Sequence, residues 1–134
     1  MESAAQPLRS HSRQFLYLLI ILIGAVFVLV YRGPYWPFVR GYMGDWLIVQ
    51  FIYVIARFWI SFRRRYRLAI AIFVFSLFVE LIQFFAAGSI PHTFAAEVTI
   101  GSTFDPGDIA AYALGLATVL LSERYWKPQG VDSN

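Results

Sequence analysis

Four long runs of apolar residues, separated by polar and basic segments, make up most of this chain. They predict helices at about residues 14–31, 44–62, 68–87 and 106–122. Each run approaches the roughly 20 residues that an α-helix, rising about 1.5 Å per residue, needs to cross a hydrocarbon core of about 30 Å. The pattern therefore predicts an all-α protein, an integral membrane four-helix bundle with one transmembrane domain from 14 to 122.

The composition also favours a membrane protein. Of the 134 residues, 59% are hydrophobic and 19% aromatic, which is too apolar for a soluble domain of this length. Cysteine is absent, so the chain forms neither disulfides nor thiolate metal sites. The net charge is +3, but the basic residues gather at the ends of the apolar runs. That distribution is typical of membrane topology, and we expect no nucleic-acid partner.

The basic residues also predict the orientation in the membrane. Four spans place the tails at 1–13 and 123–134 on the same side as the turn between the second and third helices. The opposite side holds only Arg32 and Arg40. By the positive-inside rule, both termini are expected in the cytoplasm. The cytoplasmic side then collects Arg9, Arg13, Arg57, Arg63, Arg64, Arg65, Arg67, Arg124 and Lys127.

Two polar residues, Glu80 and Gln83, interrupt the third apolar run. A carboxylate in hydrocarbon is costly, and by default it marks a functional site. Glu80 lies 13 residues beyond Arg67, about 20 Å along the helix, which places it in the extracytoplasmic half of the membrane. The structural alternative is a buried carboxyl group that hydrogen-bonds to Gln83, Tyr112 or Arg40.

The fourth predicted helix has a strong start signal, because Asp105 is a good N-cap and Pro106 suits the first helical position. Asp108 follows in the first turn, where negative charge meets the positive end of the helix dipole. Capping alone explains both aspartates about as well as a functional role does. Ala111 and Gly115 form a small-residue pair that permits close contact with another helix.

The second predicted helix carries a polar stripe of Gln50, Tyr53 and Arg57, which should face protein rather than lipid. Asp45 stands at the start of this helix, where a structural role at the N-terminus suffices. On a helical wheel Asp45 points away from the stripe. This arrangement argues against a joint role for Asp45 and the stripe.

Despite these structural alternatives, the predicted topology brings most of the acidic residues to one mouth of the bundle. A long loop, 88–104, would lie over this mouth and act as a cover, since such loops are often functional. We expect a ligand-binding site here, built from Arg40, Asp45, Glu80, Gln83, Asp105, Asp108 and Tyr112.

Several kinds of chemistry have no signature in the chain. Glycine-rich phosphate loops and the H-E-x-x-H zinc motif are absent. With no cysteine and one candidate loop histidine, His92, the sequence predicts no metal site and no cofactor. No nucleophile–base pair is visible either, so a catalytic role is disfavoured.

Three sequence blocks nevertheless have a familiar spacing. They are Arg40-x-x-x-Gly44-Asp45, then Glu80-x-x-Gln83, then Gly101-x-x-Phe104-Asp105-x-x-Asp108-x-x-x-Tyr112-x-x-Gly115. Over about residues 17–122 the chain resembles a bacterial family of small inner-membrane proteins known only as a domain of unknown function. That family is similar to the VanZ-like proteins, which share an E-x-x-Q helix followed by an acidic helix start and a glycine. VanZ-like proteins are associated with resistance to glycopeptide antibiotics of the teicoplanin type. The resemblance implies a multi-pass protein of the bacterial inner membrane and a cell-envelope setting, and it implies no defined reaction.

Four functional hypotheses follow. The leading one is binding of a lipid head group or a lipid-linked envelope precursor, with membrane lipids as partners. The second is proton or ion conduction through Glu80. The third is an enzyme acting on a lipid-linked substrate, with Glu80 or Asp108 as general base. The fourth is an accessory subunit with a protein partner in the membrane.

Overall fold

The computed structural model of the protein describes residues 6–60, 62–86 and 105–126. These residues form helices and contain no strand, which confirms the predicted all-α bundle. The loop at 88–104, predicted as a cover, lies outside the described residues. The elements are α1 (Gln6–Val30), α2 (Trp36–Phe38), η1 (Val39–Met43), α3 (Gly44–Arg57), η2 (Phe62–Arg64), α4 (Arg65–Ala86) and α6 (Pro106–Trp126).

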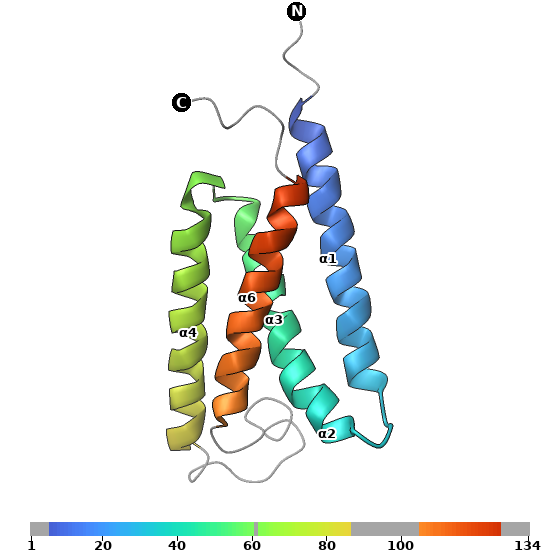
Figure 1. The fold of residues 1–134 in the computed structure, drawn as a ribbon, viewed down its shortest axis with the longest axis vertical. Coiled ribbons are helices and arrows are strands. Elements are labelled where there is room, and N and C mark those ends of the chain that lie inside the picture. The colour runs from blue at the N-terminus through green and yellow to red at the C-terminus, as the bar shows by residue number, and fades with distance from the viewer. Residues whose placement is uncertain (1–5, 61, 87–104, 127–134) are drawn as a thin grey trace, which may run out of the picture.

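Four long helices lie side by side, with α3 behind α6 and between α1 and α4 (Figure 1). It packs against α1, α4 and α6. The chain reverses direction from each long helix to the next, so α3 and α6 run parallel (Figure 1). We call the end of the bundle where α3 and α6 begin the Asp108 end, and the opposite end the Glu123 end.

Three helical segments are long and apolar enough to cross a membrane, namely His11–Val30, Trp36–Arg57 and Arg65–Ala86. Their outward faces expose large apolar side chains, as a lipid-facing surface requires; examples are Leu19, Val26, Ile70 and Phe78. The helix α6 does not reach the same apolarity, because it carries two acidic residues and an arginine, Asp108, Glu123 and Arg124. The described chain therefore fits a small membrane protein of three apolar helices, with α6 packed beside them.

The second long helix begins at Trp36, eight residues before the predicted start at 44. The α2, η1 and α3 segments follow one another without a break, and the π-helical turn η1 lies inside this continuous helix. Pro37 is tolerated in the first turn because backbone N–H groups there have no intrahelical acceptor anyway.

The start of α6 confirms the cap predicted from the sequence. The Gly107 N–H donates to the Asp105 Oδ1 at 2.9 Å, and the Asp108 N–H donates to the Asp105 carbonyl at 3.0 Å. One aspartate thus satisfies two of the otherwise unpaired N–H groups at the helix start. This cap fixes where α6 begins, and with it the height of Asp108 in the bundle.

The closest approach between helices is that of α6 to α3, at Gly115. A Cβ atom added to Gly115 would lie 2.5 Å from the Trp46 carbonyl oxygen and would also collide with the Val49 side chain. Gly115 is therefore required for this contact, which confirms that the predicted small-residue pair serves helix packing.

We predict that Gly115→Ala destabilises the fold by about 1–3 kcal/mol, because a backbone oxygen cannot rotate away from the new methyl group. Gly41→Ala is the matched control, since a Cβ at Gly41 meets nothing within 4 Å. Thermal unfolding in detergent micelles, followed by near-UV circular dichroism, measures both changes. Equal melting temperatures for the two variants would contradict the contact.

Candidate functional site

Three helices bring acidic side chains together at the Asp108 end. Asp45 comes from α3, Glu80 from α4 and Asp108 from α6, and Tyr112 of α6 lies among them. The Tyr112 hydroxyl donates to Glu80 Oε2 at 3.1 Å. Asp45 is within hydrogen-bonding reach of Asp108 and Tyr112, and Asp108 is also within reach of Glu80. We call these four residues the carboxyl cluster.

The carboxyl cluster is enclosed by the bundle, since Glu80, Asp108 and Tyr112 are buried and Asp45 is half-buried. Three carboxyl groups that lie close together repel one another when all are ionised, so a cationic or hydroxyl-bearing group is the natural partner of the cluster. Within the described residues, no group of three or more acidic or histidine side chains is arranged to bind a metal ion.

Asp105 lies just outside the carboxyl cluster, at the start of α6. The Tyr42 hydroxyl donates to Asp105 Oδ2, and the Gly107 N–H donates to the other carboxylate oxygen. These two donors hold the pKa of Asp105 below its usual value, the larger effect coming from Tyr42. Asp105 is thus an ionised capping residue that joins η1 to α6.

The helical wheel set Asp45 apart from the stripe of Gln50, Tyr53 and Arg57, and their partners in the structure also differ. Gln50 and Tyr53 are buried, whereas Asp45 is half-buried and lies near Asp108 and Tyr112. The helix α3 packs against α1, α4 and α6 and therefore buries more than one face.

The remaining two predicted site residues lie at the same end of the bundle. Gln83 is half-buried, about one turn further along α4 than Glu80. The Arg40 guanidinium lies over the Trp36 ring, 5.3 Å from its centroid. The assignment of ligand-binding residues stays a prediction, but five of the seven lie in the carboxyl cluster or directly beside it.

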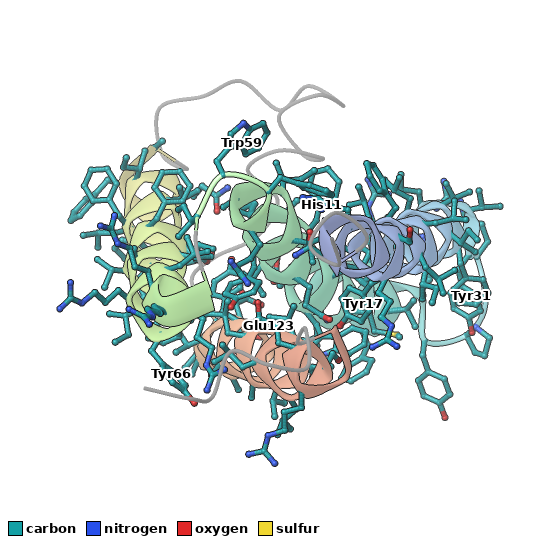
Figure 2. The ribbon with its side chains drawn as sticks, turned by 90° about the horizontal axis from the view of Figure 1, so that it is seen from above. His11, Tyr17, Tyr31, Trp59, Tyr66 and Glu123 are labelled. Atoms are coloured by element: carbon teal, nitrogen blue, oxygen red, sulfur yellow. The ribbon has the colours of Figure 1, made fainter. Side chains whose placement is uncertain are left out.

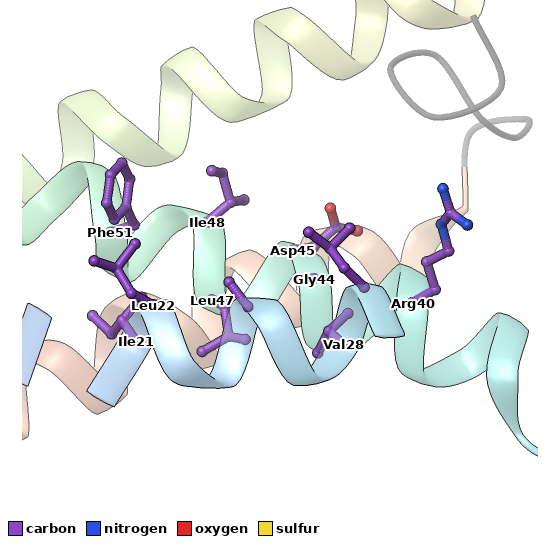
Figure 3. Close-up of a pocket in the computed structure, with 11 residues that line it drawn as sticks. Ile21, Leu22, Val28, Arg40, Gly44, Asp45, Leu47, Ile48 and Phe51 are labelled. Atoms are coloured by element: carbon purple, nitrogen blue, oxygen red, sulfur yellow. The ribbon is translucent and has the colours of Figure 1, made fainter. Parts of the chain in front are cut away.

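A groove of about 450 Å³ runs between α1 and the segment from Arg40 to Phe51 (Figure 3). We call it the α1–α3 groove. Its walls are apolar except at one end, where Arg40 and Asp45 stand. Because Asp45 also belongs to the carboxyl cluster, the two features meet at this residue. The apolar residues of the groove are Ile21, Leu22, Ala25, Val28, Leu29, Leu47, Ile48 and Phe51.

In the middle of the bundle, polar side chains connect α1, α3 and α6. The Tyr17 hydroxyl donates to Gln50 Oε1 at 2.5 Å, and Gln50 Nε2 donates to the Trp46 carbonyl at 3.0 Å. The Trp46 indole N–H donates to Thr118 Oγ1 at 3.3 Å. These bonds satisfy polar groups that would be costly to leave unpaired in an apolar interior.

At the Glu123 end, Arg57 and Glu123 form a buried ion pair with 2.5 Å between Nε and Oε1. The Arg57 and Glu123 side chains are 7% and 1% exposed. Arg57 also donates to the Ile60 carbonyl. Figure 2 shows Glu123 inside the bundle and Trp59 and Tyr66 on its surface. The Tyr53 hydroxyl and Glu123 Oε2 are buried and make no hydrogen bond with any described residue.

Sequence reasoning missed Glu123 because it stands near the end of an apolar run, where a charge is expected to reach the interface. The sequence did offer one signal for a buried anion, because the spacing of Tyr53 and Arg57 places both on one face of α3. A buried arginine needs an anion, and Glu123 belongs to the helix that lies nearest to α3.

We predict that Arg57→Met destabilises the protein by about 3–5 kcal/mol, because Glu123 then stays buried without a partner. The double variant Arg57→Met/Glu123→Met is expected to recover most of this loss, since two apolar residues replace the pair. Urea unfolding of the detergent-solubilised protein measures both. An equally large loss in the double variant would show that the charge pair is not the cause.

The comparison with known families now bears on these residues. The chain matches a family described as "Protein of unknown function (DUF2809)" over residues 35–116. The chain belongs to this family. The matched DUF2809 segment contains all seven predicted site residues and Arg57, whereas α1 and Glu123 lie outside it. The chain matches no curated protein and no solved structure significantly.

Proposed function

We propose that this DUF2809 protein binds an amphipathic ligand of the cell envelope, either a lipid through its head group or a lipid-linked precursor. The observation that carries the proposal is the α1–α3 groove, whose apolar walls end at Arg40 and Asp45. An acyl or isoprenoid chain fits the apolar part, and a polar group then lies at the charged end.

The groove has suitable dimensions and chemistry for such a ligand. Its volume of about 450 Å³ lies within the roughly 300–1,000 Å³ that is usual for small-molecule sites, and these sites are mostly apolar with a few polar groups. An apolar chain in the groove covers the exposed side chains of Leu22, Leu29 and Ile48. Burying this surface is favourable wherever water would otherwise meet it.

The charged end supplies the recognition groups. Arg40 suits an anionic group, because a guanidinium presents several donors in a plane that matches phosphate or carboxylate. Asp45 suits a hydroxyl or ammonium group, and its contacts with Asp108 and Tyr112 hold it in place. Glu80 and Asp108 lie close to Asp45 in the carboxyl cluster.

The proposed setting is the bacterial inner membrane, with both termini in the cytoplasm. Its support is the excess of basic residues at the Glu123 end, including the exposed Arg63, Arg64 and Arg67, and the resemblance to VanZ-like proteins. In that orientation the Asp108 end and the charged end of the groove lie on the extracytoplasmic side, where envelope precursors are used.

Proton conduction is a second candidate, favoured by the polar groups that run from the carboxyl cluster through Trp46 and Gln50 to Glu123. Against it, Val49, Leu116 and Val119 are buried at the level between the two charged centres. The carboxyl cluster therefore supports local protonation better than a continuous path. Proteoliposomes that keep an imposed pH gradient as well as empty liposomes do would exclude conduction.

The ligand proposal predicts a bound molecule that depends on the groove. We expect native mass spectrometry of gently solubilised protein to detect a retained lipid adduct. Ala25→Leu should reduce that adduct severalfold, because Ala25 lines the groove and a larger side chain fills it. Asp45→Asn should reduce it less, since the apolar contacts remain.

The matched control is Ala71→Leu, the same substitution at an exposed position of α4. It should leave the adduct unchanged. If Ala25→Leu and Ala71→Leu retain equal amounts of lipid, the groove is not the binding site and the proposal fails.

A further inference from the structure

Two arginines and a tryptophan gather where α1 ends and the next helix begins. The Arg32 guanidinium carbon lies 5.4 Å from the centroid of the Trp36 ring, and that of Arg40 lies 5.3 Å from the same centroid. Arg32 is exposed and Arg40 is half-buried. Two positive charges therefore lie against one indole ring.

Neither charge is neutralised by the described part of the chain. The ion pair between described residues is that of Arg57 and Glu123, at the opposite end of the bundle. Arg32 donates to the Leu29 carbonyl at 3.4 Å and to the Tyr31 carbonyl at 3.5 Å. These neutral contacts are long and leave the guanidinium charge uncompensated. Cation–π attraction to Trp36 orients both guanidinium groups but supplies no counter-charge.

Trp36 adds a third donor to this place. Its indole N–H is buried and has no acceptor among the described residues. A buried donor without an acceptor is unusual and calls for an explanation. Together with the two guanidinium groups it makes this corner of the molecule strongly attractive to an anion.

The corner is continuous with the α1–α3 groove, because Arg40 lines the groove's charged end. The corner also lies at the depth that lipid head groups occupy in a bilayer. Arg32 stands two residues beyond the apolar segment His11–Val30, and Arg40 stands four residues into Trp36–Arg57, about 6 Å along the helix. In a bilayer this is the level of the head groups, while the groove extends toward the hydrocarbon.

We propose that Arg32 and Arg40 bind the phosphate of an anionic phospholipid whose acyl chain lies in the α1–α3 groove. The inference rests on the proposed function and names the head-group chemistry that this site selects. The phosphate oxygens accept from the guanidinium groups of Arg32 and Arg40. A choline head group is rejected because its ammonium approaches the same two arginines.

The experiment is a direct competition between two lipids. The protein is equilibrated in mixed micelles that contain equal amounts of phosphatidylglycerol and phosphatidylcholine, and native mass spectrometry counts each adduct. We expect wild-type protein to be enriched in phosphatidylglycerol. Arg32→Gln should lower the ratio of the two adducts about fivefold, as expected for one arginine near an anionic surface, and should leave the total lipid bound unchanged.

Two variants control for charge. Arg67→Gln removes an exposed arginine at the Glu123 end and should leave the ratio unchanged. Arg32→Lys keeps the charge and should retain most of the enrichment. Adding millimolar inorganic phosphate should not displace the lipid, because free phosphate has no acyl chain to occupy the groove.

The outcomes separate the two proposals. Lipid adducts without phosphatidylglycerol enrichment, or equal ratios in Arg32→Gln and Arg67→Gln, overturn the phosphate site and leave groove binding standing. Displacement by inorganic phosphate overturns the lipid as the occupant of this site, since the anion alone then accounts for binding. The absence of any lipid adduct on wild-type protein overturns both proposals.

Discussion

The contact between α3 and α6 at Gly115 is the constraint on which the other features depend. With no side chain at this position, two parallel helices approach until the Trp46 carbonyl lies at the surface of α6. Polar residues on the two helices then meet at three levels, Asp45 with Asp108, Trp46 with Thr118, and Arg57 with Glu123. A wider separation would leave each of these groups without its partner in an apolar interior, where an unpaired charge is most costly.

The two charged centres differ in kind. Arg57 and Glu123 neutralise each other, so this pair specifies how α6 lies along α3 and offers little to a ligand. The carboxyl cluster has three acidic groups and no described cation, so a positively charged or hydroxyl-bearing group is its natural partner. Arg40, which lines the groove together with Asp45, instead requires an anionic partner. An amphipathic molecule with a phosphate and a hydroxyl-bearing head satisfies both.

The sequence was sufficient to predict the features that depend on local pattern. Apolar runs predicted the four helices, Asp105 and Pro106 predicted the start of α6, and the small-residue pair predicted close packing at Gly115. Tyr112 was also among the partners expected for Glu80, and it donates to that carboxylate.

Features that depend on tertiary packing escaped prediction. The wheel separates Asp45 from the stripe of Gln50, Tyr53 and Arg57, but it does not show that neighbouring helices cover both faces of α3. Glu123 resembled an interfacial charge until its partner on another helix was known. The order of helices around the bundle decides both cases, and no local pattern encodes that order.

Photocrosslinking with an anionic phospholipid that carries a diazirine in its acyl chain tests the central claim most directly. The protein is first stripped of loosely held lipid by detergent exchange, then irradiated with about one equivalent of probe, and the labelled peptides are mapped. The account predicts labelling of α1 around Ala25 and of α3 around Ile48, both of which line the groove. Labelling spread equally over the exposed outer face of α4, at Ile70 and Phe78, would contradict it.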